Sequence, residues 1–319
     1  MRMPHRRTKS ALAAGIALMC APVVAQERPI AGDSVTTTVS TRRANVREQS
    51  PPPSLRVDVN RVLVPVTVTD QSDKQKPGLR KEDFRLFEDG VAQEISEFFE
   101  DDAPVSVGVL LDSSSSMKEK FDLSKQAISA FLRLCPREDE YFLVTVQDQP
   151  ELAYSFTSQV EEIDAAMRAV TPKGWTALYD GIYLAISHLK RALRNERALL
   201  VLSDGGDNNS RYSESEIREA IRESGVRIFS VSVLGHSGSM ERFSDESGGR
   251  AFQAHKLEEL PELAHKISTL VHGEYVLGFS RSSYARDGKY HSIKVQLAPS
   301  EEARRLHMTW RHGYYAPVQ

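Results

Sequence analysis

Carboxylate and hydroxyl side chains gather in three short segments of the sequence. Asp112 is followed by four serines, Ser113–Ser116; Thr176 follows a glycine and a tryptophan; and Asp204 comes directly after an apolar run. Their oxygens are hard ligands of the kind that Mg²⁺ prefers, and Mg²⁺ typically takes one or two carboxylates and keeps bound water. If the three segments meet, they form a magnesium site whose metal can accept a further ligand.

The elements around these segments predict a mostly parallel sheet. Four apolar runs are each followed by a loop and a helical pattern: Val105–Leu111, Tyr141–Gln147, Ala198–Ser203 and Val226–Val233. Continuous rather than alternating apolar strands indicate burial on both faces, with helices on each side of the sheet. A shorter run, Leu152–Phe156, lacks a crossover helix before it and is predicted to be an antiparallel edge strand.

This sheet would bring the three segments together. In a doubly wound sheet of order 3-2-1-4-5-6, the first and fourth strands are neighbours, and ligands bind beyond their carboxyl ends. Asp112 and Asp204 follow these two strands and are expected to face one crevice. Ser114 and Ser116, two apart on a turn, can both point inward, and Thr176 adds a hydroxyl from another loop. Apolar residues at helical spacing predict helices over Val160–Val170, Leu178–Leu189 and Leu257–Leu270.

Both flanks of this α/β segment carry strand patterns. Valines alternate with other residues from Val62 to Val68, and Pro65 predicts that this strand lies at a sheet edge, because proline cannot donate to a ladder. Asp-Gly pairs at Asp89-Gly90 and Asp287-Gly288 predict two hairpins. The expected strands are Phe84–Phe87, Val91–Phe99, Tyr275–Ser280, Tyr290–Leu297 and Leu306–Arg311.

Neither flank is large enough to hold a core by itself, since two or three strands are marginal. We therefore predict one small β-sandwich built from both chain ends, residues 55–104 and 273–319. A doubly wound α/β domain, residues 105–272, is inserted between them.

Here the chain resembles the von Willebrand factor A family. Asp112, Ser114 and Ser116 match its D-x-S-x-S motif, and Thr176 and Asp204 match its distant threonine and aspartate. The resemblance implies a Rossmann-like fold with a metal-ion-dependent adhesion site. Mg²⁺, with Mn²⁺ or Ca²⁺ as alternatives, would be held by the three hydroxyls, and the two carboxylates would bind directly or through water.

The resemblance also implies a function. It is the binding of a partner protein, whose Asp or Glu carboxylate would complete the metal shell. The flanking segments resemble a bacterial secreted subgroup of related proteins, so that the resemblance extends over roughly Val57 to Pro317. Its motifs there are Leu79-x-x-Glu82-Asp83-Phe84, Glu88-Asp89-Gly90, Tyr275-Val276-Leu277-Gly278 and Gly313-Tyr314-Tyr315.

Some of these residues have simpler roles available. A strand-end aspartate such as Asp112 can cap the next helix, and serine-rich turns are common. Asp207, Asn208 and Asn209 favour turn and capping roles over partner contact. Trp175 and Tyr179, beside Thr176, fit either a binding hot spot at the rim or burial against the neighbouring helix.

The N-terminal segment predicts export. Residues 1–25 join a basic start to a short apolar run ending Val23-Val24-Ala25, the pattern of a signal peptide too short to span a membrane. Its removal takes four basic residues and changes the formal net charge from −3 to −7, which argues against a nucleic-acid partner. Residues 26–54 are expected to be a flexible tether, and the protein to be periplasmic or extracellular with no membrane span. Cys135 would be the one cysteine left, a buried small hydrophobe.

Two other functions are weighed against partner binding. A magnesium-dependent hydrolase would need a nucleophile or base beside the metal, but position 114 is serine rather than a second aspartate. Ser239 stands where a nucleophile elbow at Gly235-His236-Ser237-Gly238 would require glycine. The third function is a scaffold in a cell-envelope assembly with a purely structural metal. The sequence favours a binding protein, not an enzyme.

Overall fold

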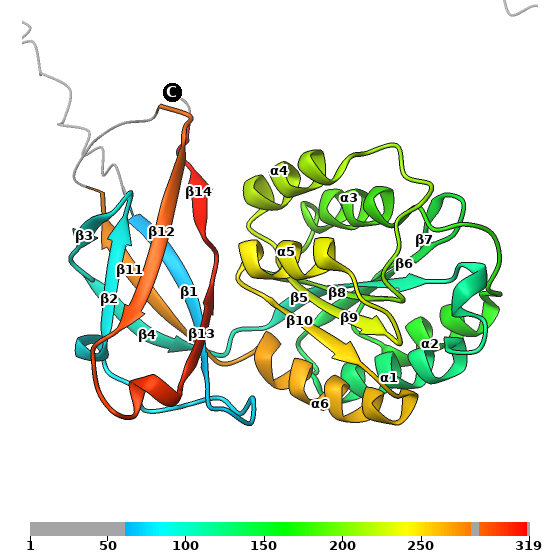
Figure 1. Cartoon of the computed structure of the whole chain (residues 1–319), viewed down its shortest axis with the longest axis horizontal. Helices are drawn as coiled ribbons and strands as arrows, with labels where there is room; N and C mark the ends of the chain where they lie inside the picture. Colours follow the sequence, from blue (N-terminus) through cyan, green and yellow to red (C-terminus); the bar gives the residue numbers. More distant parts are fainter. Residues whose placement is uncertain (1–60, 282–286, 318–319) are drawn as a thin grey trace, which may run out of the picture. The chain divides into compact units, whose positions relative to one another are not determined.

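The computed structural model describes residues 61–281 and 287–317 (Figure 1). The predicted signal peptide, residues 1–25, and the predicted tether, residues 26–54, lie outside these ranges. In the described ranges, no helix combines the length and the apolar character needed to cross a bilayer. The described residues form one six-stranded sheet covered by helices and two four-stranded sheets that enclose a core of their own.

The six-stranded sheet has the strand order β10-β9-β8-β5-β6-β7. Its strands are β5 (Val105–Asp112), β6 (Glu140–Val146), β7 (Pro150–Thr157), β8 (Glu196–Ser203), β9 (Arg227–Val233) and β10 (Arg250–Ala254). Every neighbouring pair is parallel except β6 and β7, which are antiparallel. The predicted doubly wound order and its antiparallel edge strand are therefore confirmed. β10 was not predicted, because its sequence, Arg-Ala-Phe-Gln-Ala, contains no continuous apolar run.

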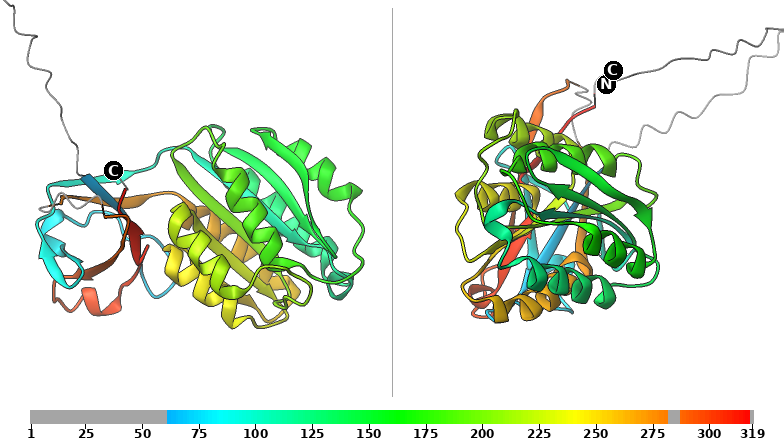
Figure 2. Two further views of the ribbon diagram at one scale, coloured as in Figure 1. Left: turned by 90° about the horizontal axis from the view of Figure 1, so that it is seen from above. Right: turned by 90° about the vertical axis from the view of Figure 1, so that its right-hand side faces the viewer.

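Helices cover both faces of this sheet. The helices are α1 (Phe121–Leu134), α2 (Val160–Ala169), α3 (Leu178–Leu189), α4 (Glu214–Ser224), α5 (Gly238–Ser247) and α6 (Leu260–Val271). In Figure 1, α3, α4 and α5 lie on one face and α1, α2 and α6 on the other, and Figure 2 shows the first three from above. Two separate apolar cores follow from this arrangement, one on each face, with Phe131 and Ile267 in the first and Ile182 and Phe243 in the second. The predicted final helix begins as a short 3-10 turn, Leu257–Glu259.

The β-sandwich takes strands from both chain ends, as predicted. One sheet has the order β13-β1-β11-β4 and the other β14-β12-β2-β3. The strands are β1 (Arg61–Thr69), β2 (Phe84–Glu88), β3 (Val91–Gln93), β4 (Glu97–Asp101), β11 (Glu274–Ser280), β12 (Tyr290–Leu297), β13 (His307–Trp310) and β14 (Gly313–Tyr315). Their inward side chains, among them Val64, Leu86 and Leu277, form a third core. Two short 3-10 turns, Lys81–Asp83 and Ala303–Arg305, complete the sandwich.

Two details of the sandwich strands correct the sequence predictions. β1 is not an edge strand, since it lies between β13 and β11. Pro65 is opposite Val276 of β11, but the pairing of β1 with β13 starts only at Val66. Proline is tolerated because position 65 does not have to donate a ladder bond to β13. The predicted strand Val91–Phe99 is divided between β3 and β4, which belong to different sheets.

The two Asp-Gly pairs behave differently. Asp89 and Gly90 have φ values of 48° and 80° and join the antiparallel strands β2 and β3, which confirms the first hairpin. The second hairpin is wrong. β11 pairs with β1 and β4, while β12 pairs with β2 and β14, so the chain crosses from one sheet to the other around Asp287-Gly288.

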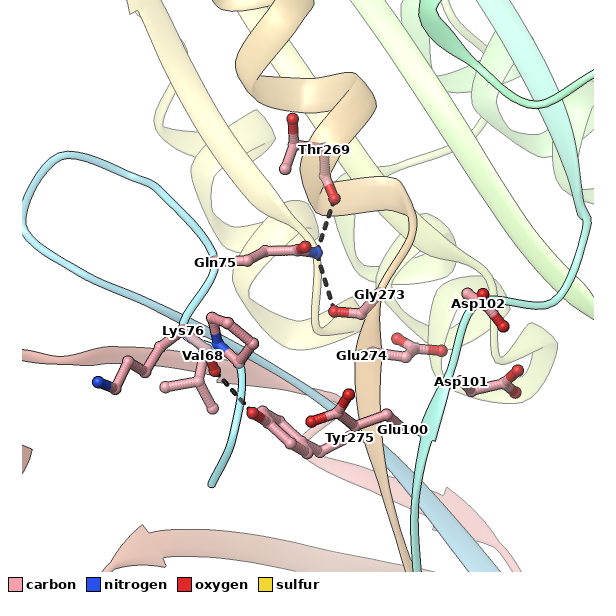
Figure 3. A pocket seen from close by; sticks show the side chains of 11 residues that line it. Val68, Gln75, Lys76, Glu100, Asp101, Asp102, Thr269, Gly273, Glu274 and Tyr275 are labelled. Atoms are coloured by element: carbon pink, nitrogen blue, oxygen red, sulfur yellow. Dashed lines mark hydrogen bonds between the residues drawn. The ribbon is translucent and has the colours of Figure 1, made fainter. Parts of the chain in front are cut away.

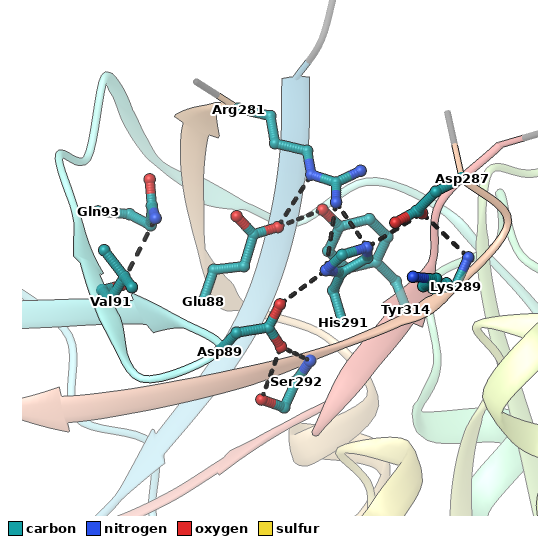
Figure 4. Close-up of polar contacts among 10 residues, drawn as sticks. All are labelled: Glu88, Asp89, Val91, Gln93, Arg281, Asp287, Lys289, His291, Ser292 and Tyr314. Atoms are coloured by element: carbon teal, nitrogen blue, oxygen red, sulfur yellow. Dashed lines mark hydrogen bonds and ion pairs between the residues drawn. The ribbon is translucent and has the colours of Figure 1, made fainter. Parts of the chain in front are cut away.

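A cluster of polar side chains lies beside the Asp89-Gly90 turn of the sandwich (Figure 4). Glu88 accepts a hydrogen bond of 2.6 Å from the Tyr314 hydroxyl, and the Arg281 Nε lies 3.3 Å from the same carboxylate oxygen. His291 Nδ1 is 2.7 Å from Asp89 Oδ2, and Ser292 donates its backbone N–H to Asp89 Oδ1 at 2.8 Å. These bonds connect the two chain ends that make the sandwich.

The connection from α6 to β11 passes a loop of the sandwich (Figure 3). The Gln75 amide donates to the carbonyls of Thr269, at 2.7 Å, and Gly273, at 2.8 Å. The Tyr275 hydroxyl donates to the carbonyl of Lys76 at 2.7 Å. Gly273 has a φ of 65°, which allows the sharp change of direction between the helix and the strand.

Candidate metal centre

Asp112 is the last residue of β5 and is completely buried. Its Oδ1 accepts the backbone N–H of Ser114 at 2.9 Å, and its Oδ2 accepts the hydroxyl of Ser203 at 2.7 Å. Loss of water raises the pKa of Asp112, and the negative charge of Asp204 raises it further, although the bonds from Ser203 and Ser114 oppose this shift. The two carboxylates predicted from the sequence therefore interact, as expected for neighbouring strand ends.

Ser114 and Ser116 bring their hydroxyls together. Ser114 is buried and directly precedes the turn Ser115–Met117, whereas Ser116 is exposed in the middle of this turn. Their Oγ atoms are 3.1 Å apart. Neighbouring ligands in an octahedron with bonds of 2.0–2.1 Å are separated by about 3 Å. The spacing of the two hydroxyls thus suits adjacent positions around a magnesium-sized ion.

The loop with Thr176 is held against the serine turn by backbone bonds. Ser115 donates its N–H to the Gly174 carbonyl at 3.1 Å, and Lys173 donates to the Ser113 carbonyl at 2.9 Å. Asp148, between β6 and β7, accepts the N–H of Trp175 at 2.8 Å. Gly174 is required here: its φ is 72°, and a Cβ at this position would lie 2.6 Å from an Asp148 oxygen.

The loop after β8 completes the candidate site at the carboxyl end of the sheet. Thr176 is buried, and its backbone N–H donates to the side-chain oxygen of Asn208 at 2.9 Å. Asp204 is half-buried, and its Oδ2 lies 2.9 Å from the ammonium of Lys120. Lys120 lies between the serine turn and α1, so the ion pair connects this segment to the end of β8.

Neighbouring polar residues have the turn and capping roles favoured by the sequence. Asp207 accepts the N–H of Tyr179 at 3.2 Å, in the first turn of α3. Asn209 donates its side-chain amide to the Asp148 carbonyl at 2.7 Å. Of the two aromatic residues, Trp175 is 65% exposed, whereas Tyr179 packs edge-on against Phe243 at a centroid distance of 5.6 Å. Trp175 is therefore exposed, as a residue at the rim would be, whereas Tyr179 packs against the neighbouring helix.

Three residues that support the site were missed by the sequence analysis: Lys120 and Ser203, which bond candidate ligands, and Asp148, which holds the loop with Thr176. Ser203 could have been found, because it directly precedes Asp204 at the end of a predicted strand. Lys120 and Asp148 follow no periodic pattern, and only the folded loops bring them to this edge. The structure connects all three predicted segments here, and the assignment of Asp112, Ser114, Ser116, Thr176 and Asp204 as metal ligands stays a prediction.

A comparison with protein families agrees with this fold. Residues 107–206 match the family model described as von Willebrand factor type A domain. The matched stretch runs from β5 to the loop after β8 and contains all five candidate ligands. The chain contains a von Willebrand factor type A domain.

Individual relatives are distant. An uncharacterized protein of Borreliella burgdorferi is 27% identical over 155 residues, which are 45% of this chain and 44% of that protein. Proximal thread matrix protein 1 from the mussel byssus, solved with a zinc-occupied MIDAS motif, is 19% identical with a TM-score of 0.50, over 58% of this chain and 50% of that one. BatB from Bacteroides thetaiotaomicron is 17% identical with a TM-score of 0.43, over 52% of this chain and 98% of that one. The chain spans about half the length of the Borreliella and mussel proteins, and these likenesses concern the fold alone.

Proposed function

We propose that this chain is an exported binding protein that captures a carboxylate of a partner protein through a divalent cation, Mg²⁺ in the first place. Asp112, Ser114, Ser116, Thr176 and Asp204 would hold the ion. The observation that carries this proposal is the pair of Ser114 and Ser116 hydroxyls, 3.1 Å apart in front of the buried Asp112 carboxylate. The cation would supply an electrophile that accepts one more oxygen ligand.

The charges at the site support a cation. Burial raises the pKa of Asp112 and the negative charge of Asp204 raises it further, while the ammonium of Lys120 lies beside Asp204. A divalent ion near both carboxylates would relieve the repulsion that Lys120 balances only in part. The donor set contains hydroxyl and carboxylate oxygens, which favour Mg²⁺ over softer metals. The mussel protein with a zinc-occupied MIDAS motif supports a divalent ion other than Mg²⁺ as an alternative.

The hydrogen bonds of Asp112 and of the two serine hydroxyls favour binding over catalysis. Both oxygens of Asp112 already accept hydrogen bonds, from Ser114 and Ser203, which makes the group a poor nucleophile or base. Ser114 and Ser116 bond each other, so neither is activated by a base as a nucleophilic serine requires. The residues here orient a ligand and hold charge.

Trp175 gives the partner a place to dock. Its ring is 65% exposed, and its backbone N–H is fixed by Asp148, one residue before the buried Thr176. A rigidly mounted aromatic ring at the rim of a polar site is typical of a binding hot spot. We infer that the partner covers Trp175 while its carboxylate reaches the metal. The export of the chain is supported by the signal-peptide pattern in residues 1–25.

The proposal is tested by capture from the envelope fraction of the source organism, with Mg²⁺ and with chelator in parallel. The bound partner should be retained with Mg²⁺, released by chelator, and lost with Asp112→Ala. Ser115→Ala is the matched control, because the exposed Ser115 side chain adjoins the site but is not a predicted ligand. Retention that is equal with and without metal, or equal for Asp112→Ala, would show that binding does not pass through the site.

A further inference from the structure

Three side chains of different chemistry meet at the opposite end of the six-stranded sheet. One donor atom each of Cys135, Asp139 and His272 lies within 4.8 Å of the other two. Cys135 follows α1, Asp139 precedes β6, and His272 follows α6. Because β5 and β6 are parallel, a residue before β6 lies at the end of the sheet away from Asp112, which ends β5. This cluster is therefore separate from the candidate magnesium site.

The histidine is oriented as a metal-binding histidine is. Its Nδ1 lies 3.0 Å from the Ser268 carbonyl, which can only accept, so this nitrogen carries a proton. Its Nε2 faces the cluster and lies 2.8 Å from Asp139 Oδ2. Histidines that bind metals commonly donate the other ring N–H to a carbonyl or carboxylate in this way, which fixes the ring and the tautomer.

The other two donors are also held in place. Asp139 is completely buried, and its Oδ1 accepts the N–H of Val105 at 2.8 Å, which leaves Oδ2 directed at His272. The Cys135 thiol is half-buried, donates a weak bond of 3.4 Å to the Phe131 carbonyl and also interacts with the Tyr141 hydroxyl. Burial raises the pKa of this thiol, so it is protonated unless a cation replaces the proton.

We propose that Cys135, Asp139 and His272 bind one Zn²⁺ ion through Sγ, Oδ2 and Nε2. A sulfur, nitrogen and oxygen set of this kind suits zinc and not Mg²⁺, which prefers oxygen alone. The fourth tetrahedral position is taken by water. On binding, the Cys135 thiol proton leaves to solvent, together with any proton that His272 Nε2 shares with Asp139, so the ion replaces protons and no redox step is involved.

The spacing and the local charge both allow the ion. Ligands at 2.0–2.3 Å in a tetrahedron are about 3.3–3.7 Å apart, so the cluster has to shift by no more than about 1 Å. Arg227 opposes a positive charge at His272, and its guanidinium is paired with the buried Glu274 at 2.9 Å. A thiolate and a carboxylate then balance the two charges of Zn²⁺.

Such an ion would join three elements at one point. It would tie the end of α1 and the start of β6 to His272, which leads through Gly273 into β11. Zinc would thereby fix the place where the α/β domain continues into the sandwich, and would stabilise the native state by mass action.

Cobalt spectroscopy on the full chain tests the proposal, with Mg²⁺ in large excess to occupy any oxygen site. Cys20→Ser serves as the background, so that Cys135 is the one thiol present. One equivalent of Co²⁺ should give a thiolate-to-cobalt charge-transfer band in the near ultraviolet, and Zn²⁺ should displace it. Cys135→Ser should remove the band and weaken Zn²⁺ binding by more than the roughly 10–100-fold that loss of a supporting group costs.

Two further variants separate this site from the magnesium site. Asp112→Ala should leave the cobalt band unchanged, whether or not the proposed function is correct. His272→Gln should weaken Zn²⁺ binding while Cys135 stays in place, which covers the case that Cys135→Ser fails to fold. Absence of a thiolate band in the parent protein, or its survival in the folded Cys135→Ser variant, would overturn the proposal.

Discussion

The α/β domain and the β-sandwich reach stability in different ways. The α/β sheet and its two apolar cores are complete within β5 to α6, Val105 to Val271. The sandwich instead alternates strands from the two chain ends: β1 is paired on both sides with strands that come more than two hundred residues later. The α/β domain, which carries the candidate ligands, should therefore stay folded after truncations that unfold the sandwich.

The largest expected effect follows from this difference. Removal of residues 275–319 takes away β11 and β13, the partners of β1, and leaves Val62, Val64 and Val66 without cover. We expect residues 61–101 to unfold or aggregate while the α/β domain stays folded, because its core closes without them. Hydrogen exchange resolves the two parts. Unchanged protection of β1 in the truncated chain would show that the N-terminal strands fold independently.

Loss of one hydroxyl should weaken metal binding at the candidate site. Ser114→Ala removes a predicted ligand from the pair of hydroxyls 3.1 Å apart, and we expect Mg²⁺ binding to weaken by at least about tenfold, comparable to the loss of a group that supports a metal ligand. Ser115→Ala changes the exposed neighbouring hydroxyl and should leave the affinity within about twofold. Calorimetric titration measures both. Equal affinities for the two variants would exclude Ser114 as a ligand.

Trp175 should separate partner binding from metal binding. Trp175→Ala is expected to weaken binding of the captured partner by about 1–2 kcal/mol, since truncation of an interface aromatic has effects of this order. Mg²⁺ binding should not change, because Trp175 contributes no predicted ligand. Leu193→Ala, at another strongly exposed apolar side chain, is the control. An identical loss for both variants would mean that Trp175 has no special place in the interface.

The smallest effect concerns acid stability of the sandwich. Burial acts to raise the pKa of Asp89, but hydrogen bonds with His291 and Ser292 outweigh it and the pKa is lowered (Figure 4). Such a group stabilises the folded state above its unfolded pKa of about 3.9, and this stabilisation is lost as the pH falls through the folded value.

Asp89→Asn should therefore reduce the unfolding free energy at neutral pH and match the parent protein in strong acid. The difference should stay below about 1 kcal/mol, because the Asp89 side chain is about half exposed to screening solvent. Asparagine also tolerates the positive φ of this turn, so the backbone is not disturbed. Urea unfolding from pH 3 to pH 7 gives the comparison. A constant difference over this range would contradict the role given to the charge.

The sequence predicted those features that local patterns determine. The strand order placed Asp112 beside Asp204, because continuous apolar runs identify buried parallel strands whatever their loops contain. The edge assignment of β1 failed, since Pro65 disfavours ladder bonds only at its own position and β13 pairs one residue later. The hairpin at Asp287-Gly288 failed because an Asp-Gly turn signal does not reveal which sheet the next strand joins.

Partners brought together only by tertiary structure were out of reach. Lys120 and Asp148 contact the site from loops without any motif, and Cys135 and His272 meet across two helices that are distant in sequence. No spacing rule connects such residues, because their proximity depends on how α1 and α6 pack on the sheet. The sequence therefore identifies the oxygen site, and the cysteine–histidine cluster requires the fold.

The proposed magnesium site is best tested by calorimetric titration of the full chain with Mg²⁺, with Asp112→Ala measured beside it. We expect one Mg²⁺ site in the parent protein and none in the variant, with circular dichroism showing the same fold for both. Mg²⁺ should also raise the melting temperature of the parent alone, by a stabilisation of about 2.7 kcal/mol at a hundred times the dissociation constant. A parent protein that binds no Mg²⁺, or a folded Asp112→Ala variant that binds it equally well, would contradict the account.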